Sequence, residues 1–182
     1  MIYMFIAEGF EEIEALCPLD IIRRAGLPIK TVGIGAKEIT GAHSITVKAD
    51  MSDSEFDVLV DKSADMIFLP GGMPGTLNLA NSKTVVNAIN NAHQSGSYIA
   101  AICAAPSILG DMGLLNGKKA ICYPGFESRL SGATLSEAKV VLDGKILTAA
   151  GMGVALDMGL KIVEIFCGEE KAAALRHAVI AD

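Results

Sequence analysis

The chain has 182 residues, of which 51% are hydrophobic and 20% charged, so a disordered or collagen-like chain is excluded. We expect one domain over residues 1–182, because a chain of this length buries about 70% of its unfolded surface. The net charge of −6, from 15 basic and 21 acidic residues, and the lack of tryptophan argue against nucleic-acid binding. No apolar run approaches the roughly 20 residues of a membrane-spanning helix, so we expect no membrane association.

The thiols and the start of the chain indicate a cytoplasmic protein. The apolar residues 1–7 have no basic residue before them and are followed by acidic residues, unlike a secretory signal. The four cysteines should then be reduced. No two of them have C-x-x-C spacing and the three histidines are scattered, so the spacing predicts no metal site.

Short apolar runs alternate with segments of helical periodicity along the chain. The predicted strands are residues 2–7, 29–33, 45–48, 66–69, 98–102 and 119–122, and a hairpin of 140–142 with 145–148. The predicted helices are residues 13–25, 84–95, 106–112, 154–166 and 169–178. Pro18 lies inside the first helix, where it should kink the helix or mark its effective start.

This alternation predicts an α/β protein with a mostly parallel, flavodoxin-like sheet between two layers of helices. Ligands in such folds bind at the carboxyl ends of the strands. Glycine-containing turns fall at these ends, at Gly9, Gly71-Gly72 and Gly151-Met152-Gly153, together with Cys103.

Cys103 follows the apolar strand 98–102 and precedes two alanines and Pro106, which can open a helix. This order is typical of a nucleophile elbow with cysteine in place of serine. A buried core cysteine is the commoner reading of a cysteine in an apolar run, but the small residues and the sheet-end position favour the nucleophile. A helix N-terminus should lower the pKa of this thiol. The backbone N–H groups of Ala104 and Gly72 could hold an oxyanion or a sulfenate.

Three carboxylates, Glu11, Glu12 and Glu14, follow the first strand. The favourable position of acidic residues in the first turn of a helix explains Glu11 and Glu12. Glu14 lies one turn further in, and it can reach the Cys103 thiol if the first strand neighbours the strand before Cys103. A buried carboxyl beside a thiolate would be held protonated and would donate a hydrogen bond to the sulfur.

Three segments, AEGFEEIE at 7–14, LPGG at 69–72 and AAICAAP at 100–106, resemble the ThiJ/PfpI superfamily. The resemblance covers essentially the whole chain and is closest to the branch of the parkinsonism-associated deglycase and redox-sensor protein. It implies a flavodoxin-like homodimer that needs no metal or cofactor. Cys103 matches the reactive nucleophile and Glu14 its acidic partner, while Gly72 and Ala104 match the backbone donors that face the sulfur.

The sequence departs from the family pattern at three positions. Tyr123 stands where a histidine is common, so a protease-type Cys–His dyad is not supported. Ala150 replaces a frequent arginine ahead of Gly151, and His43 replaces an arginine common at the dimer interface. We treat Gly71, Tyr123, Ala150 and Gly151 as candidate pocket residues.

The resemblance implies a glyoxalase or deglycase that acts on methylglyoxal-like dicarbonyls or their adducts, with Cys103 as nucleophile and Glu14 as proton shuttle. The alternative is a non-enzymatic oxidative-stress sensor, or a redox-regulated chaperone, in which peroxide oxidises Cys103 to a sulfinate. Amidase or peptidase chemistry is the least favoured, because the usual histidine is missing. The expected partners are a small aldehyde, a dicarbonyl or peroxide, and a second copy of the chain.

The remaining cysteines and histidines receive simpler interpretations. We expect Cys122 in the core at a strand end, with Tyr123 placing it close to the pocket, and Cys167 in the core. Cys17 is a candidate for the dimer interface, and His93 and His177 are expected on the surface.

Overall fold

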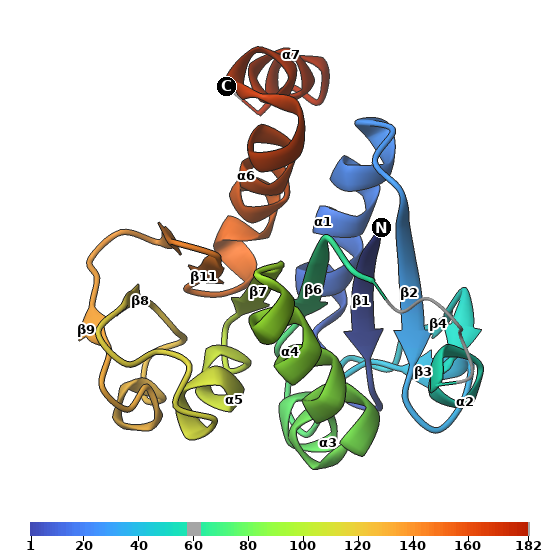
Figure 1. The fold of residues 1–182 in the computed structure, drawn as a ribbon. Helices are drawn as coiled ribbons and strands as arrows, with labels where there is room; N and C mark the ends of the chain where they lie inside the picture. Colours follow the sequence, from blue (N-terminus) through green and yellow to red (C-terminus); the bar gives the residue numbers. More distant parts are fainter. Residues whose placement is uncertain (58–62, 182) are drawn as a thin grey trace.

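A seven-stranded sheet forms the centre of the protein in a computed structural model that describes residues 1–57 and 63–181 (Figure 1). Its strands are β1 (Ile2–Ile6), β2 (Ile29–Gly33), β5 (Met51–Ser52), β6 (Met66–Leu69), β7 (Tyr98–Ile102), β10 (Val140–Asp143) and β11 (Ile146–Ala149). The strand order is β10-β11-β7-β6-β1-β2-β5. Every neighbouring pair is parallel except β10 and β11, which form the predicted antiparallel hairpin.

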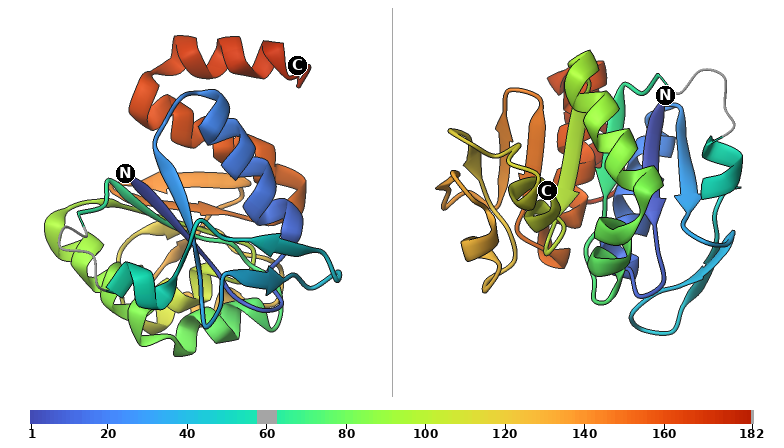
Figure 2. Two further views of the ribbon diagram at one scale, coloured as in Figure 1. Left: turned by 90° about the vertical axis from the view of Figure 1, so that its right-hand side faces the viewer. Right: turned by 60° about the horizontal axis from the view of Figure 1, so that its bottom comes forward.

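Helices cover both faces of this sheet, as Figure 2 shows from two further directions. They are α1 (Glu12–Arg24), α2 (Asp53–Asp57), α3 (Gly75–Asn81), α4 (Lys83–Ser95), α5 (Pro106–Asp111), α6 (Ala155–Cys167) and α7 (Glu169–Ala178). Helices α1 and α6 pack side by side on one face, and α7 packs against α6. None of the described helices is long and apolar enough to cross a membrane.

The hydrophobic core is divided by the sheet into two halves. On β1, Ile2, Met4 and Ile6 pack with α1 and α6, while Tyr3 and Phe5 pack with the helices of the opposite face. Successive strand residues point to opposite faces, so a strand covered on both sides must be apolar throughout. This packing confirms the predicted flavodoxin-like three-layer architecture.

Local sequence determines where helix α4 begins and ends. The Ser82 side chain accepts a hydrogen bond from the Val85 N–H at 3.4 Å, which caps the helix. Gly96 ends it with φ of +72°, a left-handed conformation that glycine adopts without steric cost.

Pro18 neither begins nor ends α1, which runs from Glu12 through the proline to Arg24. A proline removes one helical hydrogen bond, but packing supports this turn. A Cβ at Gly159 of α6 would lie 3.0 Å from the Pro18 Cα, so the two helices approach closely at this point. Tertiary contact therefore outweighs the local penalty.

Two small sheets in the described part of the chain lie outside the central one. The strand predicted at 45–48 is β4 (Thr46–Lys48), which pairs antiparallel with β3 (Glu38–Thr40). The strand predicted at 119–122 is shorter: β8 (Lys119–Ala120) pairs with β9 (Thr134–Leu135) and does not join the central sheet. Some elements are too short to show a period, so no pattern in the sequence predicts them: β3, β5, α2, α3 and β9.

Candidate active site

Cys103 occupies a sharp turn between β7 and α5. Its φ is +65°, a left-handed value that costs a residue with a side chain about 1–3 kcal/mol. Two hydrogen bonds hold the turn: the Cys103 N–H donates to the Ala149 carbonyl at 2.9 Å, and the Cys103 carbonyl accepts from the Tyr123 N–H at 2.8 Å. The helix begins at Pro106, as predicted. This strained strand–turn–helix geometry is that of a nucleophile elbow.

Glu14 lies beside the Cys103 thiol, to which it is hydrogen bonded. It comes from the first turn of α1 and is only 1% exposed. Its Oε2 accepts from the Gly71 N–H at 3.0 Å, and the Met152 N–H also donates to the carboxyl. The carboxyl therefore has a fixed orientation toward the sulfur.

The route by which Glu14 reaches the thiol differs from the one expected. Strand β6 lies between β1 and β7, so the condition that the first strand neighbours the strand before Cys103 is wrong. The contact forms because Gly71, just after β6, has no side chain. A Cβ at Gly71 would lie 2.6 Å from both the Cys103 Cβ and the Glu14 Oε2. The missing side chain leaves the space in which the two groups meet.

The environment raises the pKa of both groups. Burial raises the pKa of Glu14 to about 7, against the opposing effect of hydrogen bonds from Cys103 and from backbone N–H groups. Burial and the Glu14 charge raise the pKa of Cys103 to about 12. The N–H groups of Gly72 and Ala104 do bond the sulfur and lower this pKa, but they do not outweigh burial. The expected lowering of the thiol pKa is therefore wrong in direction.

Two groups that share one buried site can exchange a proton. Above pH 7, Glu14 is a carboxylate hydrogen bonded to a neutral thiol. A carboxylate that is hydrogen bonded to a thiol can accept the thiol proton while the sulfur attacks an electrophile. The same carboxyl, once protonated, can return the proton to the substrate.

Two of the other candidate pocket residues lie beside this pair. A Cβ at Gly151 would be 3.3 Å from the Tyr123 Cδ2 and 3.8 Å from the Glu14 Oε1. The Tyr123 ring thus covers Gly151 next to Glu14, with half of its surface exposed. Ala150 is half-buried. Its N–H donates to the carbonyl of Lys139, the residue before β10, at 2.9 Å and not to Cys103 or Glu14.

His43 does not contact the thiol but pairs with two acidic residues. Its Nδ1 is 3.0 Å from Glu12 Oε2 and 3.3 Å from Glu11 Oε2, and its N–H donates to Glu12 Oε1 at 2.8 Å. These three residues bring ligand atoms within 4.8 Å of one another and could hold a metal ion. The hydrogen bond from His43 and backbone N–H donors already satisfy the buried Glu12, however, and hold its pKa below the ordinary value despite burial.

The remaining cysteines and histidines are spread over the fold. Cys122 is buried, and burial raises its pKa to about 11. The expectation that Cys167 lies in the core is wrong, because it is the last residue of α6 and is exposed. Cys17 is half-buried. His93 and His177 are exposed, as predicted.

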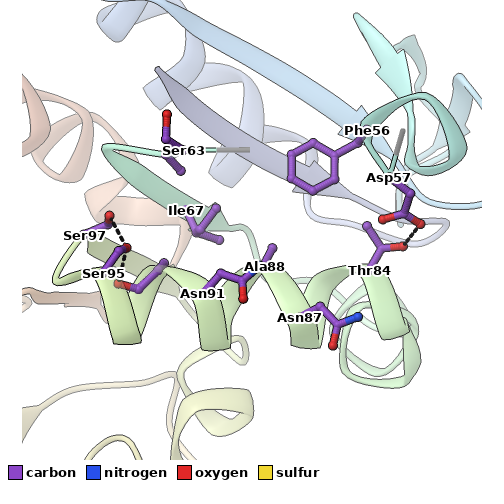
Figure 3. Close-up of a pocket in the computed structure, with 12 residues that line it drawn as sticks. Phe56, Asp57, Ser63, Ile67, Thr84, Asn87, Ala88, Asn91, Ser95 and Ser97 are labelled. Atoms are coloured by element: carbon purple, nitrogen blue, oxygen red, sulfur yellow. Dashed lines mark hydrogen bonds between the residues drawn. The ribbon is translucent and has the colours of Figure 1, made fainter. Parts of the chain in front are cut away.

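A cavity of about 560 Å³ lies away from this chemistry, along α4 (Figure 3). Figure 3 shows its polar lining, which includes Thr84, Asn87, Asn91 and Ser95. None of its lining residues belongs to the Cys103–Glu14 site. Reactive groups, and not cavity size, therefore define the candidate active site.

Sequence reasoning missed two features of the site. The Met152 N–H contacts Glu14, and the Gly-x-Gly spacing at 151–153 was the signal that could have indicated this backbone approach. The gap at Gly71 was also missed, since a glycine after a strand does not reveal what occupies the space beside it.

Comparison with known proteins agrees with this geometry. The model of the DJ-1/PfpI family matches residues 1–165. Protein DJ-1 homolog B of Arabidopsis thaliana is 37% identical over 96% of the chain, although the chain spans only 40% of that relative's length. The glutathione-independent glyoxalase DJR-1.2 of Caenorhabditis elegans is 29% identical over 92% of the chain and 89% of its own length.

The solved structures agree in backbone as well. Oxidized DJ-1 of Toxoplasma gondii superposes with a TM-score of 0.93, at 30% identity, over 98% of this chain and 97% of the other. Sequence and fold match together over nearly the full length. The chain therefore belongs to the DJ-1/PfpI family.

Proposed function

We propose that the protein is a cysteine-dependent glyoxalase or deglycase that acts on methylglyoxal-like dicarbonyls or their adducts without a metal or cofactor. The observation that carries the proposal is the buried pair of Cys103 and Glu14, a thiol hydrogen bonded to a carboxyl with a pKa of about 7. Such a carboxyl can both accept and donate a proton near neutral pH. The Caenorhabditis elegans relative is named a glutathione-independent glyoxalase, which supports this choice.

The first step forms a bond between the Cys103 sulfur and the aldehyde carbon of methylglyoxal. The Glu14 carboxylate takes the thiol proton as the sulfur attacks. The carbonyl electrons move to the aldehyde oxygen, which the N–H groups of Gly72 and Ala104 can stabilise because they already face the sulfur. Protonation of that oxygen by Glu14 gives a hemithioacetal.

The second step needs no external oxidant. Glu14 removes the hydrogen of the former aldehyde carbon as a proton and delivers it to the neighbouring ketone carbon. The hydroxyl proton of the hemithioacetal passes to the ketone oxygen, so the first carbon is oxidised to a thioester and the second is reduced to an alcohol by the same electron pair. Water then hydrolyses the thioester, which releases lactate and restores the thiol.

The test is formation of lactate from methylglyoxal in the absence of glutathione. We expect the wild type to form lactate and Cys103→Ser to lose about 10³-fold or more of the rate. Cys167→Ser is the matched control, because this exposed cysteine lies at the end of α6 and should leave the rate unchanged. Product must be measured, since any thiol or amine can bind dicarbonyls. A folded wild type without lactate, or an active Cys103→Ser, would contradict the proposal.

A second candidate is a peroxide sensor or redox-regulated chaperone that uses the same thiol. It is favoured by the raised pKa of Glu14, since a protonated carboxyl can donate a hydrogen bond to a sulfinate. Two equivalents of peroxide would oxidise the thiol to the sulfinate and be reduced to water. A mass increase of about 32 Da on Cys103, two oxygens, supports it. Oxidation confined to other residues would exclude it.

We also propose that residues 1–182 form one domain and that two copies of the chain form a homodimer in the reducing cytoplasm. Ile13 and Ile45 are about half exposed, and the Ile45 N–H donates to Oε1 of Glu12, the residue before Ile13, at 3.4 Å. Neighbouring apolar side chains on a surface favour association. A second copy covering them would bury this surface beside the active site.

A further inference from the structure

Three large, exposed apolar residues lie on the segments whose backbone contacts the reactive pair. Met73, Tyr123 and Met152 are 46%, 51% and 53% exposed. Isolated apolar side chains on a surface need no explanation. These three come from separate segments of the chain, and each lies within one residue of a group that contacts the pair.

Backbone contacts show how each of the three residues lies relative to the reactive pair. Met73 follows Gly72, whose N–H bonds the Cys103 sulfur. Met152 donates its own N–H to Glu14. The Tyr123 N–H is fixed to the Cys103 carbonyl, and its ring lies against Gly151 beside Glu14. Polar backbone groups therefore face the sulfur and the carboxyl, while the side chains of the same loops offer apolar surface.

The charge beside the pair disfavours one class of substituent. Glu11 is close enough to Glu14 to raise its pKa, and Glu12 follows in the same turn of α1. A negatively charged group on the substrate would be repelled by the carboxylates of Glu11 and Glu14. An uncharged, apolar substituent meets no such cost and can displace water from the rim.

We propose that the site prefers 2-oxoaldehydes with an apolar substituent on the ketone carbon, and that Tyr123 determines this preference by packing its ring against that substituent. This inference rests on the proposed glyoxalase function and specifies its substrate. Phenylglyoxal would react by the same steps as methylglyoxal. The aldehyde carbon is oxidised, the ketone carbon is reduced, and water is added to give mandelate.

The test compares phenylglyoxal with methylglyoxal by formation of mandelate and lactate. We expect the wild type to show a kcat/KM for phenylglyoxal about tenfold above that for methylglyoxal, a discrimination typical of one apolar contact. Tyr123→Ala should bring the ratio close to one, because KM should rise more for phenylglyoxal than for methylglyoxal. Tyr123→Phe keeps the ring and should keep the ratio.

Leu142→Ala is the control, since this exposed apolar residue lies on β10 at the sheet edge and should not change the ratio. Far-UV circular dichroism and the midpoint of thermal unfolding, compared with the wild type, report that Tyr123→Ala is folded. Lactate formation by the wild type without a preference for phenylglyoxal, or an unchanged ratio in Tyr123→Ala, would overturn this inference alone. Absence of both products from the folded wild type would overturn the proposed function and this inference with it.

Discussion

Glu14 and Cys103 meet across the space that a side chain at Gly71 would fill. They come from α1 and from the end of β7, and β6 lies between the strands that precede them. A Cβ at Gly71 would be 2.6 Å from an atom of each. The buried acid–thiol pair thus depends on a third residue that takes no part in chemistry.

Gly71→Ala should separate the pair. A contact of 2.6 Å is too short for a carbon atom, so the Glu14 carboxyl or the Cys103 turn must shift. We expect a loss of lactate formation of about 10²-fold, as for misplaced catalytic groups. Gly153→Ala is the matched control, because a Cβ there has no neighbour within 4 Å. Equal activity of the two variants would show that the pair tolerates the shift.

The activity should rise with pH through about 7. Glu14 must be a carboxylate to accept the thiol proton, and its pKa is raised to about 7. Glu14→Gln should remove this pH dependence and lower kcat/KM by about 10²- to 10⁴-fold. The measurement is a pH profile of lactate formation for both proteins. An unchanged profile in the variant would assign the titration to another group.

The rate of alkylation of Cys103 distinguishes two protonation states of the pair: a Glu14 carboxylate with a neutral thiol, and a protonated Glu14 with a thiolate. The Glu14 charge contributes to the raised pKa of Cys103, so Glu14→Gln should accelerate alkylation of Cys103 at pH 8. The exposed Cys167 provides an internal reference in the same sample, quantified by peptide mass spectrometry. Slower alkylation in the variant would instead indicate a thiolate that protonated Glu14 stabilises.

Glu14 should destabilise the fold at neutral pH. Its folded-state pKa of about 7 exceeds the ordinary 4.5, so the folded protein binds more protons than the unfolded chain between these values. The free energy of unfolding must therefore fall as pH rises through this window, by about 3 kcal/mol at most. Denaturant unfolding at pH 4 and pH 8 measures this, and Glu14→Gln should show a smaller fall. A wild type that gains stability from Glu14 over this range would contradict the raised pKa.

The proposed dimer should depend on Ile13. A charge at this half-exposed position would be costly to bury between two copies. Ile13→Asp should therefore shift the protein toward monomer in analytical ultracentrifugation, while Leu135→Asp, at a similar exposure on β9, should not. A monomeric wild type would remove the dimer from the proposal.

The sequence predicts the architecture well because the elements that build it are long or fully buried. β2, β6, β7 and α7 match their predicted bounds. Apolar runs and capping residues carry that information locally. The short elements β3, β5, α2 and α3 depend on tertiary contacts and show no period of their own.

The residues of the candidate site could be predicted from the sequence, but the pKa of the thiol and the exposure of the other cysteines could not. The motif placed Cys103 at the elbow, and the resemblance paired it with Glu14. A helix N-terminus favoured a lowered thiol pKa, yet burial and the Glu14 charge raise it. Similarly, an apolar helix suggested a buried Cys167, although it lies at the exposed helix end. Desolvation and exposure depend on the assembled fold, which local sequence does not specify.

The most direct test of Cys103 as the nucleophile is a single-turnover experiment with methylglyoxal followed by intact-protein and peptide mass spectrometry. If Cys103 has this role, one equivalent of methylglyoxal becomes covalently attached to Cys103 and is lost again at the rate at which lactate is formed. Lactate formation without an adduct on Cys103, or an adduct that persists while lactate accumulates, would contradict it.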